Sequence, residues 1–374
     1  MTPIQISGGR DGTAIVRSRD ALAALASEWD LLAGTTGLPT LSHAWVLACA
    51  ESLYKEGELH IITVRVRGVL AAVAPLVAVD RAGITRLELI GCSYLYEPSG
   101  LLFDSVNALD VLLRSIVDVR RPFVLSRIPS PICSRLREVG RGVMFVKAGV
   151  GTAAVPITSG WREYVSQLSS RQRYDLKRAR RRVEETGKVT VRIHSPRPEE
   201  VATMFAELVR VEQASWKAHH GSSMARRDDL RRFFLNYATR TSQAGTVRFG
   251  FLDVDNRTVA AQLSVEYADR LWVLKIGYDQ AWSRCSPGWQ LLAEMMRYAF
   301  ERQLKSYEFL GSDEPWLHRW DTEGRDFSTL VCYPHTMLGL YGLAADAIGR
   351  VQARIGRGRT RDRPSDVNAG AASG

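Results

Sequence analysis

Two adjacent carboxylates, Asp313 and Glu314, combine a reactive residue type with a position at which ligands commonly bind. They closely follow Ser306–Leu310 (SYEFL), an apolar run that predicts a short strand. Ligands of open α/β sheets gather at the carboxyl ends of strands. Burial beside Trp316 and Trp320 would raise the pKa of such a carboxyl and suit it to remove a proton. Alternatively, the acid pair interacts only with the dipole of a helix that begins there.

His318 is a second candidate for the same proton transfer. An imidazole changes its charge near neutral pH, so it can accept a proton under ordinary conditions. A single histidine in such a position is more often a structural residue. Both interpretations place the chemistry in the same short stretch of chain.

The stretch from Lys275 to Trp320 predicts the elements that would position these groups. Arg270–Tyr278 (RLWVLKIGY) is apolar and β-rich, which predicts a buried strand. After the polar loop Asp279–Pro287, apolar residues recur with helical spacing through Gly288–Gln303. The strand that precedes the acid pair comes next. Strand, loop, helix and strand in this order form a parallel crossover unit.

The first turn of the predicted helix is a candidate anion site. Amides around Gly288, Trp289 and Gln290 lack intrahelical partners, and the helix dipole adds a positive potential. Gly288 would let a pyrophosphate approach the backbone closely. An ordinary capped helix that packs its Leu and Met residues into a core has the same features.

Two short motifs of this stretch carry a resemblance to a known family. Ser-Pro-Gly opens the helix, and Gly-x-Asp-Glu-Pro-aromatic-x-x-Arg-Trp follows the next strand. With the order of the strands, this resembles the acyl-CoA-binding half of GNAT acyltransferases, and more closely the FemAB-related CelD/BcsL group linked to polysaccharide biosynthesis. The chain departs from that group in having Trp316-Leu317 where Tyr-Lys is usual, and it lacks the Gln/Arg-x-x-Gly-x-Gly/Ala loop of single-domain GNAT proteins. The matching positions are Tyr278, Asp279, Ser286, Pro287, Gly288, Gly311, Asp313, Glu314, Pro315, Arg319 and Trp320.

The resemblance implies an N-acyltransferase that takes acetyl-CoA and needs no metal. Asp313 would take the proton of an acceptor amine, with Glu314 and His318 as further candidates. Glu266 lies where a general glutamate of such enzymes can occur. Tyr278 lies where they present a hydroxyl or backbone group to the thioester, or else is a core aromatic. The expected cofactor-binding residues are Ser286, Pro287, Gly288, Trp289 and Gln290.

The implied acceptor is an amino sugar of a lipid-linked or nucleotide-linked precursor of an exopolysaccharide or cell-envelope polymer. Arg171, Arg178 and Arg182 share one face of an arginine-rich helix, which suits a diphosphate or lipid headgroups but equally a solvated surface. Trp216 would stack on a sugar ring or act as a hydrophobic anchor, and Trp316 and Arg319 complete the expected substrate contacts.

Two other functions remain open. FemAB relatives suggest aminoacyl transfer from a charged tRNA, the one nucleic acid expected as a partner. The departure from the Tyr-Lys pair leaves room for a non-catalytic scaffold or second-messenger receptor at the membrane.

An internal similarity predicts two tandem copies of one α/β domain. Residues 67–91 and 256–277 each contain a strand with Ala-Ala, a further strand and a closing Ile-Gly. Each copy is expected to be a mixed, mostly antiparallel sheet flanked by helices. The first copy lacks the Ser-Pro-Gly and Gly-x-Asp-Glu motifs, so we expect it to be catalytically silent and to help form the acceptor cleft. The predicted units are residues 1–150, 151–335, an amphipathic helix at 336–356 and a basic, disordered tail at 357–374.

Composition limits the possible partners. The chain has 374 residues and a net charge of +10, which favours an anionic ligand or surface. Five scattered cysteines without metal or disulfide spacing fit a reducing cytoplasm. No apolar run approaches the roughly 20 residues that span a bilayer. We therefore expect a cytoplasmic protein, with a possible contact to an anionic membrane through residues 336–363. Arginine pairs in the tail also suggest cyclic di-GMP as a regulator.

Overall fold

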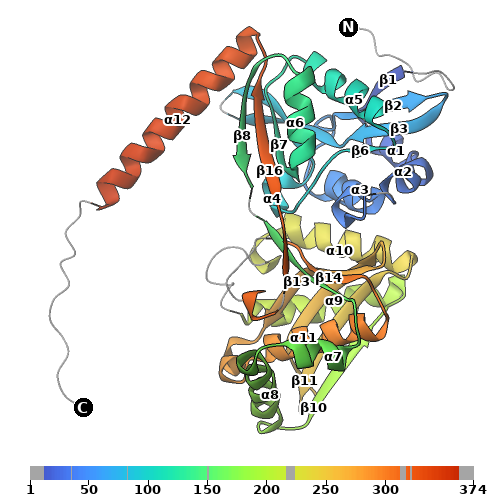
Figure 1. Cartoon of the computed structure of the whole chain (residues 1–374), viewed down its shortest axis with the longest axis vertical. Coiled ribbons are helices and arrows are strands. Elements are labelled where there is room, and N and C mark those ends of the chain that lie inside the picture. Colours follow the sequence, from blue (N-terminus) through green and yellow to red (C-terminus); the bar gives the residue numbers. More distant parts are fainter. Residues whose placement is uncertain are drawn as a thin grey trace.

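The computed structural model describes residues 12–34, 36–81, 83–149, 151–215, 224–311, 317–320 and 322–361. They form two halves that lie one above the other along the long axis of the molecule (Figure 1). The expected α/β class, with mixed and mostly antiparallel sheets flanked by helices, is confirmed.

The N-terminal half contains two sheets. The first has the order β1-β2-β3-β6 and is antiparallel, and the second has the order β4-β5-β7-β16-β8, in which β5 and β7 are parallel. The strands are β1 (Gly12–Val16), β2 (Ile61–Val66), β3 (Val69–Ala74), β4 (Leu76–Arg81), β5 (Ile84–Leu89), β6 (Leu102–Phe103), β7 (Phe123–Pro129), β8 (Val143–Ala148) and β16 (Phe327–Tyr333).

The C-terminal half is built on one sheet with the order β10-β11-β12-β13-β14-β9-β15, in which β13 and β14 are parallel. Its central strands are buried along almost their whole length, as expected of a sheet covered on both faces. The strands are β9 (Thr152–Pro156), β10 (Val189–His194), β11 (Val247–Val254), β12 (Arg257–Tyr267), β13 (Arg270–Tyr278), β14 (Ser306–Phe309) and β15 (Glu323–Arg325).

Helices cover these sheets, and several begin at side-chain caps that the sequence supplies. Ser105 caps the helix that packs on the N-terminal sheets, and Ser169 with Gln172 forms a capping box at the start of the arginine-rich helix. The helices are α1 (Arg19–Ala23), α2 (Ala26–Ala33), α3 (His43–Ser52), α4 (Cys92–Leu95), α5 (Val106–Asp118), α6 (Ser130–Val139), α7 (Trp161–Gln167), α8 (Ser170–Glu184), α9 (Pro198–Gln213), α10 (Asp228–Gln243), α11 (Pro287–Glu301) and α12 (Met337–Arg361).

Pro75 separates two strands of the N-terminal half. Since proline has no N–H to donate to a ladder, the chain breaks there into β3 and β4, which belong to different sheets. The carbonyl of Pro75 accepts a hydrogen bond from the amide of Ile90 at 2.8 Å, which ties the break to the end of β5. The chain therefore crosses from one sheet to the other at Pro75.

Each half contains one pair of parallel strands that separate after a short pairing. In the C-terminal half, β13 and β14 pair from Arg270–Ser306 to Val273–Phe309, after which β14 ends while β13 continues beside β12. In the N-terminal half, β5 and β7 pair at Leu87–Phe123 and Glu88–Val124. We call these two places the C-terminal fork and the N-terminal fork.

The two halves share one hydrophobic core. Trp45 of α3 packs edge-on against Phe233 and Tyr237 of α10, with ring centroids 4.9 Å apart in both pairs. Arg240 of α10 also forms an ion pair of 2.7 Å with Glu51 of α3. This core joins buried residues of both halves, so it fixes the position of the N-terminal fork relative to the C-terminal fork.

One strand that follows the C-terminal half in the sequence belongs to a sheet of the N-terminal half. Residues 327–333 were expected within the unit 151–335, but as β16 they pair with β7 and β8 in the N-terminal sheet. β16 lies between β7 and β8, and a boundary drawn at one point in the sequence cannot represent such long-range pairing. As a result, the end of the C-terminal half is bound to the N-terminal sheet (Figure 1).

Helix α12 covers the helix predicted at 336–356 and continues five residues into the predicted tail, and it projects from the body of the molecule (Figure 1). Its first turns are held by an ion pair of 2.6 Å between Arg86 of β5 and Asp346. Met337, Tyr341 and Ile348 are exposed apolar residues along it. The tail arginines proposed to bind cyclic di-GMP lie outside the described side chains, so that idea stays a prediction. No helix among the described residues is long and apolar enough to cross a membrane.

Candidate functional site

The start of α11 is more enclosed than the sequence predicts. Ser286 adopts a left-handed conformation (φ 54°), and the amides of Trp289 and Gln290 both donate to its carbonyl, at 3.1 and 3.2 Å. A methyl group on Gly288 would come within 3.0 Å of the Tyr278 ring. The glycine and Pro287 are buried. The close approach that Gly288 permits is thus made by Tyr278, and the expectation of three free amides with an open turn is wrong.

Basic side chains nevertheless surround this helix start. α8 packs against α11 and against the 3-10 helix Gln280–Cys285, and Arg182 donates to the carbonyl of Arg284 at 3.3 Å. Arg171 and Arg178 of α8 are exposed. The structure thus brings one of the three predicted arginines, Arg182, into contact with the loop before α11 and leaves the other two in solvent.

Glu266 lies at the wrong end of the sheet for the expected role. It forms ion pairs with Arg248 at 3.0 Å and Arg302 at 3.3 Å, and it accepts a hydrogen bond from Tyr298 at 2.8 Å. Because β12 and β13 are antiparallel, the end of β12 that carries Glu266 lies beside the beginning of β13. Tyr278 lies at the other end of β13, so Glu266 is a structural residue of an ion-pair cluster.

Aromatic residues around the expected acceptor contacts do come together. Trp289 and Trp320 stack with centroids 4.5 Å apart, and the Arg319 guanidinium lies 5.5 Å from the Trp289 ring. Asp313, Glu314, Trp316 and Trp216, together with the side chain of His318, lie outside what the structure describes. Their predicted roles remain predictions.

Glu97 is an acid that the sequence-based search missed. It belongs to the N-terminal half, yet its Oε2 accepts a hydrogen bond of 2.6 Å from the amide of Gly311, two residues after β14. Arg127 of β7 reaches the same place and donates to the carbonyls of Gly311 and Tyr96. The one sequence signal was the Glu-Pro pair at 97–98, which repeats the Glu-Pro pair at 314–315.

Charge and burial act in opposite directions on Glu97. Desolvation by burial raises the pKa of its carboxyl to about 7, while Lys275 of β13, Arg127 and the Gly311 amide oppose this rise. Lys275 also lies 4.7 Å from the ring centroid of Phe234 in α10. A half-buried carboxyl that titrates near neutrality between two cations is a recognised feature of functional sites.

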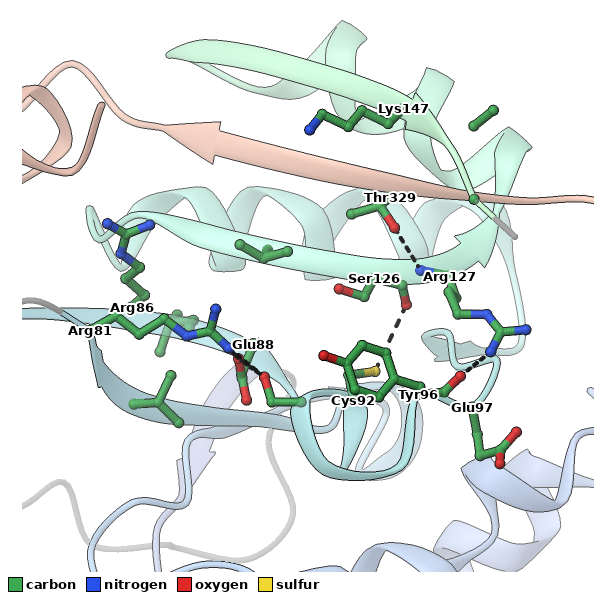
Figure 2. Close-up of a pocket in the computed structure, with 16 residues that line it drawn as sticks. Arg81, Arg86, Glu88, Cys92, Tyr96, Glu97, Ser126, Arg127, Lys147 and Thr329 are labelled. Carbon is green, nitrogen blue, oxygen red and sulfur yellow. Dashed lines mark hydrogen bonds and ion pairs between the residues drawn. The ribbon is translucent and has the colours of Figure 1, made fainter. Parts of the chain in front are cut away.

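A pocket of about 390 Å³ adjoins Glu97 in the N-terminal fork (Figure 2). Its walls come from β4, β5 and α4 on one side and from β7, β8 and β16 on the other, so the pocket occupies the space between the separating strands. Apolar walls are supplied by residues such as Val79, Leu87 and Val124. The charged side chains that line it are Arg81, Arg86, Arg127, Lys147, Glu88 and Glu97.

The polar groups of this pocket are only partly satisfied. Arg86, Glu88 and Arg127 are each less than a tenth exposed, and Arg86 Nε, Glu88 Oε1 and Arg127 Nε have no partner within the described residues. Arg81 contacts Glu88 at 3.4 Å and Ser93 at 2.7 Å. Four cations and two carboxylates line the pocket, and Asp346 of α12 pairs with Arg86, so the balance is positive by one charge. A positive balance suits a ligand with an anionic group.

Comparisons with known proteins agree with this geometry. Residues 170–317 match the model of the acetyltransferase (GNAT) domain. The matched segment contains β13, α11 and β14, and therefore the C-terminal fork. No curated protein matches the chain. Residues 170–317 of the chain therefore resemble a GNAT acetyltransferase domain.

Solved structures resemble both halves together. The C-terminal domain of a protein described as a lysylphosphatidylglycerol synthetase of Agrobacterium fabrum is 12% identical, with 87% of this chain and 97% of that chain covered and a TM-score of 0.56. FemX is 13% identical, with 85% and 96% covered and a TM-score of 0.56. L-PGS of Bacillus licheniformis is 10% identical, with 92% and 99% covered and a TM-score of 0.53. At such identities the likeness concerns the fold, which is of the GNAT-like, FemAB type.

Proposed function

We propose that the protein transfers an acyl group, acetyl in the first instance, from coenzyme A to the amine of an anionic amino-sugar precursor. The observation that carries this proposal is the C-terminal fork, where β13 outruns β14 beside the start of α11 within the GNAT-matched segment. A thioester inserted there would meet backbone groups of β13, which can polarise its carbonyl.

We infer that one face of β13 binds the donor and the other face binds the acceptor. Successive residues of a strand point to opposite faces. Tyr278 packs against the start of α11, whereas Lys275 points to α10 and Glu97. We therefore infer that coenzyme A lies on the α11 face, with its phosphates near Arg182 and Arg178, and that the acceptor arrives on the opposite face.

The N-terminal pocket supports an acceptor with a phosphate or carboxylate. Its positive balance, its partly unsatisfied arginines and its contact with Gly311 through Arg127 place a cationic binding surface next to the C-terminal fork. An amino sugar linked to a phosphate fits these features, and the resemblance to the CelD/BcsL group favours an exopolysaccharide or envelope precursor. The half expected to be catalytically silent would then hold the acceptor.

The test is binding followed by turnover. We expect acetyl-CoA and CoA to raise the melting temperature of the full chain, and acetyl-CoA with UDP-glucosamine, glucosamine 1-phosphate or glucosamine to release CoA thiol. A stable protein that is not stabilised by acetyl-CoA and releases no thiol with any of the three amines would refute the proposal.

Aminoacyl transfer is the second candidate, because the fold likeness to the lysylphosphatidylglycerol synthetase domain extends over both halves. The same assay with lysyl-tRNA as donor separates the two. Transfer from lysyl-tRNA together with no transfer from acetyl-CoA would favour this alternative.

We also infer a contact between α12 and an anionic membrane surface. Exposed Met337, Leu340, Tyr341 and Ile348 lie on a helix whose later sequence is rich in arginine. The full chain is expected to sediment with vesicles that contain phosphatidylglycerol but not with phosphatidylcholine vesicles. A variant ending at residue 349 should lose most of this binding, and equal binding by both proteins would contradict the inference.

A further inference from the structure

We propose that Glu97, contributed by the N-terminal half, is the general base that takes the proton of the acceptor amine. The inference rests on the proposed acyl transfer and adds to it the residue that handles the proton. It also changes the role of the N-terminal half, since a half without the family's sequence motifs would supply a catalytic group.

Glu97 lies beside the two strands of the C-terminal fork. Its Oε2 is held by the Gly311 amide just past the end of β14, and Lys275 of β13 lies close enough to act on its charge. The carboxylate therefore lies beside the end of β14 and within electrostatic reach of Lys275, in the part of β13 that continues past β14. Its Oε1 has no partner within the described part of the chain and is available to an incoming amine.

The backbone around Glu97 is held in a costly conformation. Tyr96, directly before Glu97, and Arg127 both have left-handed backbone angles, with φ of 58° and 51°. For residues other than glycine this conformation costs about 1 kcal/mol or more and is concentrated at functional sites. Arg127 donates to the Tyr96 carbonyl, so the two strained residues stabilise each other and fix the direction of the Glu97 side chain.

Glu97 can be reached from the pocket of the N-terminal fork. Glu97 is half-buried and lines the pocket of the N-terminal fork as well as a smaller hollow beside Trp45 and Gly91. Figure 2 shows Glu97 and the Arg127 guanidinium at one end of the larger pocket and Arg81 and Arg86 at the other. An acceptor whose anionic group is bound by these arginines can present its amine to Glu97.

The reaction balances without a further reactant. The neutral amine nitrogen attacks the thioester carbonyl carbon and forms the new C–N bond, and Glu97 accepts the proton that the nitrogen loses. The C–S bond then breaks, the electron pair leaves with the CoA sulfur, and the proton passes from Glu97 to that thiolate. The products are the amide and CoA thiol, and Glu97 is again a carboxylate.

The titration of Glu97 supplies a test that a purely structural role would not satisfy. The groups that face it are Lys275, Arg127, the Gly311 amide and the Cys92 thiol of α4. Their combined effect with burial leaves a pKa of about 7. Since a base acts in its ionised form, kcat/KM should rise with pH through this value and level off above it.

The experiment compares full-length wild type with Glu97→Gln, Glu97→Asp and the control Glu138→Gln, using acetyl-CoA and UDP-glucosamine. Glutamine keeps an oxygen that can accept from the Gly311 amide, so the fold is preserved. Glu138 is an exposed acid on α6, away from the pocket. We expect Glu97→Gln to lose about 100-fold or more in kcat, together with the rise near pH 7, while its affinity for acetyl-CoA stays the same.

The outcomes are separable. Glu97→Asp should retain the ionisation with a smaller loss in rate, and Glu138→Gln should behave as wild type. A folded Glu97→Gln variant that keeps kcat and the pH dependence overturns the role of Glu97 and leaves acyl transfer standing. A wild type that neither binds acetyl-CoA nor transfers to UDP-glucosamine, glucosamine 1-phosphate or glucosamine overturns the proposed function and this inference with it.

Discussion

The N-terminal and C-terminal forks share a strand pattern but differ in what fills them. In the C-terminal fork a single helix, α11, connects the two parallel strands, and its start is packed by Tyr278. In the N-terminal fork the connection is long and runs through α4, β6 and α5, which leaves room for a cation-lined pocket. Under the proposed function, the same arrangement of strands would bind the donor in one half and the acceptor in the other.

The N-terminal half contributes side chains to the end of a strand in the other half. Glu97, in the segment after β5, accepts a hydrogen bond from the Gly311 amide, and Arg127 of β7 donates to the Gly311 carbonyl. Neither fork is complete alone, because the described acid beside the end of β14 comes from the opposite half. Four changes test this division, from the largest expected effect to the smallest.

Trp45→Ala tests whether the forks are held together by the shared core. Removal of a fully buried indole that packs on Phe233 and Tyr237 should reduce the free energy of unfolding by about 4 kcal/mol. Urea unfolding followed by far-UV circular dichroism and by tryptophan fluorescence measures this loss. The matched control, Trp161→Ala, removes an indole that packs on Tyr164 and Phe300 within the C-terminal half. If only the control were destabilising, the halves would be independent domains.

Arg127→Met tests the bridge between the forks. It removes a buried guanidinium that binds the carbonyls of Tyr96 and Gly311 and balances Glu97. We expect a loss of about 3 kcal/mol in the free energy of unfolding, because buried partners are left unpaired. Arg231→Met, at an exposed i,i+3 ion pair, should cost less than about 0.5 kcal/mol. Equal stability of the two variants would show that Arg127 does not bridge the halves.

Glu266→Gln tests whether the far end of β12 takes part in catalysis. Loss of the carboxylate leaves Arg248 and Arg302 without their ion-pair partner and should cost about 2 kcal/mol of unfolding free energy. The pH profile of kcat/KM should not change, since Glu266 lies away from the end of β13 that carries Tyr278. A profile that loses its rise near pH 7 would return Glu266 to the list of candidate bases.

Lys147→Ala tests the pocket of the N-terminal fork. This exposed cation lines the pocket and has no ion pair among the described residues. We therefore expect KM for UDP-glucosamine to rise several-fold, which corresponds to about 1 kcal/mol, while kcat stays unchanged. Steady-state kinetics measure both. Lys188→Ala, an exposed lysine before β10, is the control. A rise in KM that is the same in both variants would point to general surface charge rather than to the pocket.

The elements of the C-terminal fork could be predicted because their signals are local. Arg270–Tyr278 is mostly apolar, and the spacing of Leu291, Leu292, Met295 and Met296 has the period of a helix, so a strand and a helix are expected. The parallel crossover follows from their order. The openness of the turn at Gly288 could not be predicted, because it depends on which side chain packs there.

The site itself was less predictable than the fold. The interaction between Glu97 and Gly311 joins residues 214 positions apart. No periodicity or spacing in a sequence indicates a contact between residues so far apart. For Glu266 the strand was predicted correctly, but the sequence did not show which end of the antiparallel pair carries this residue. The place of β16 in the N-terminal sheet had no local signal either.

By itself the sequence determined which segments become strands and helices, the family that one segment resembles and the positive charge of the whole. Only the tertiary structure decided which acid meets the end of β14, which strand closes each sheet and where a cavity remains. The physical reason is that backbone propensity and hydrophobic period act over a few residues, whereas these outcomes depend on how buried surfaces from both halves pack together.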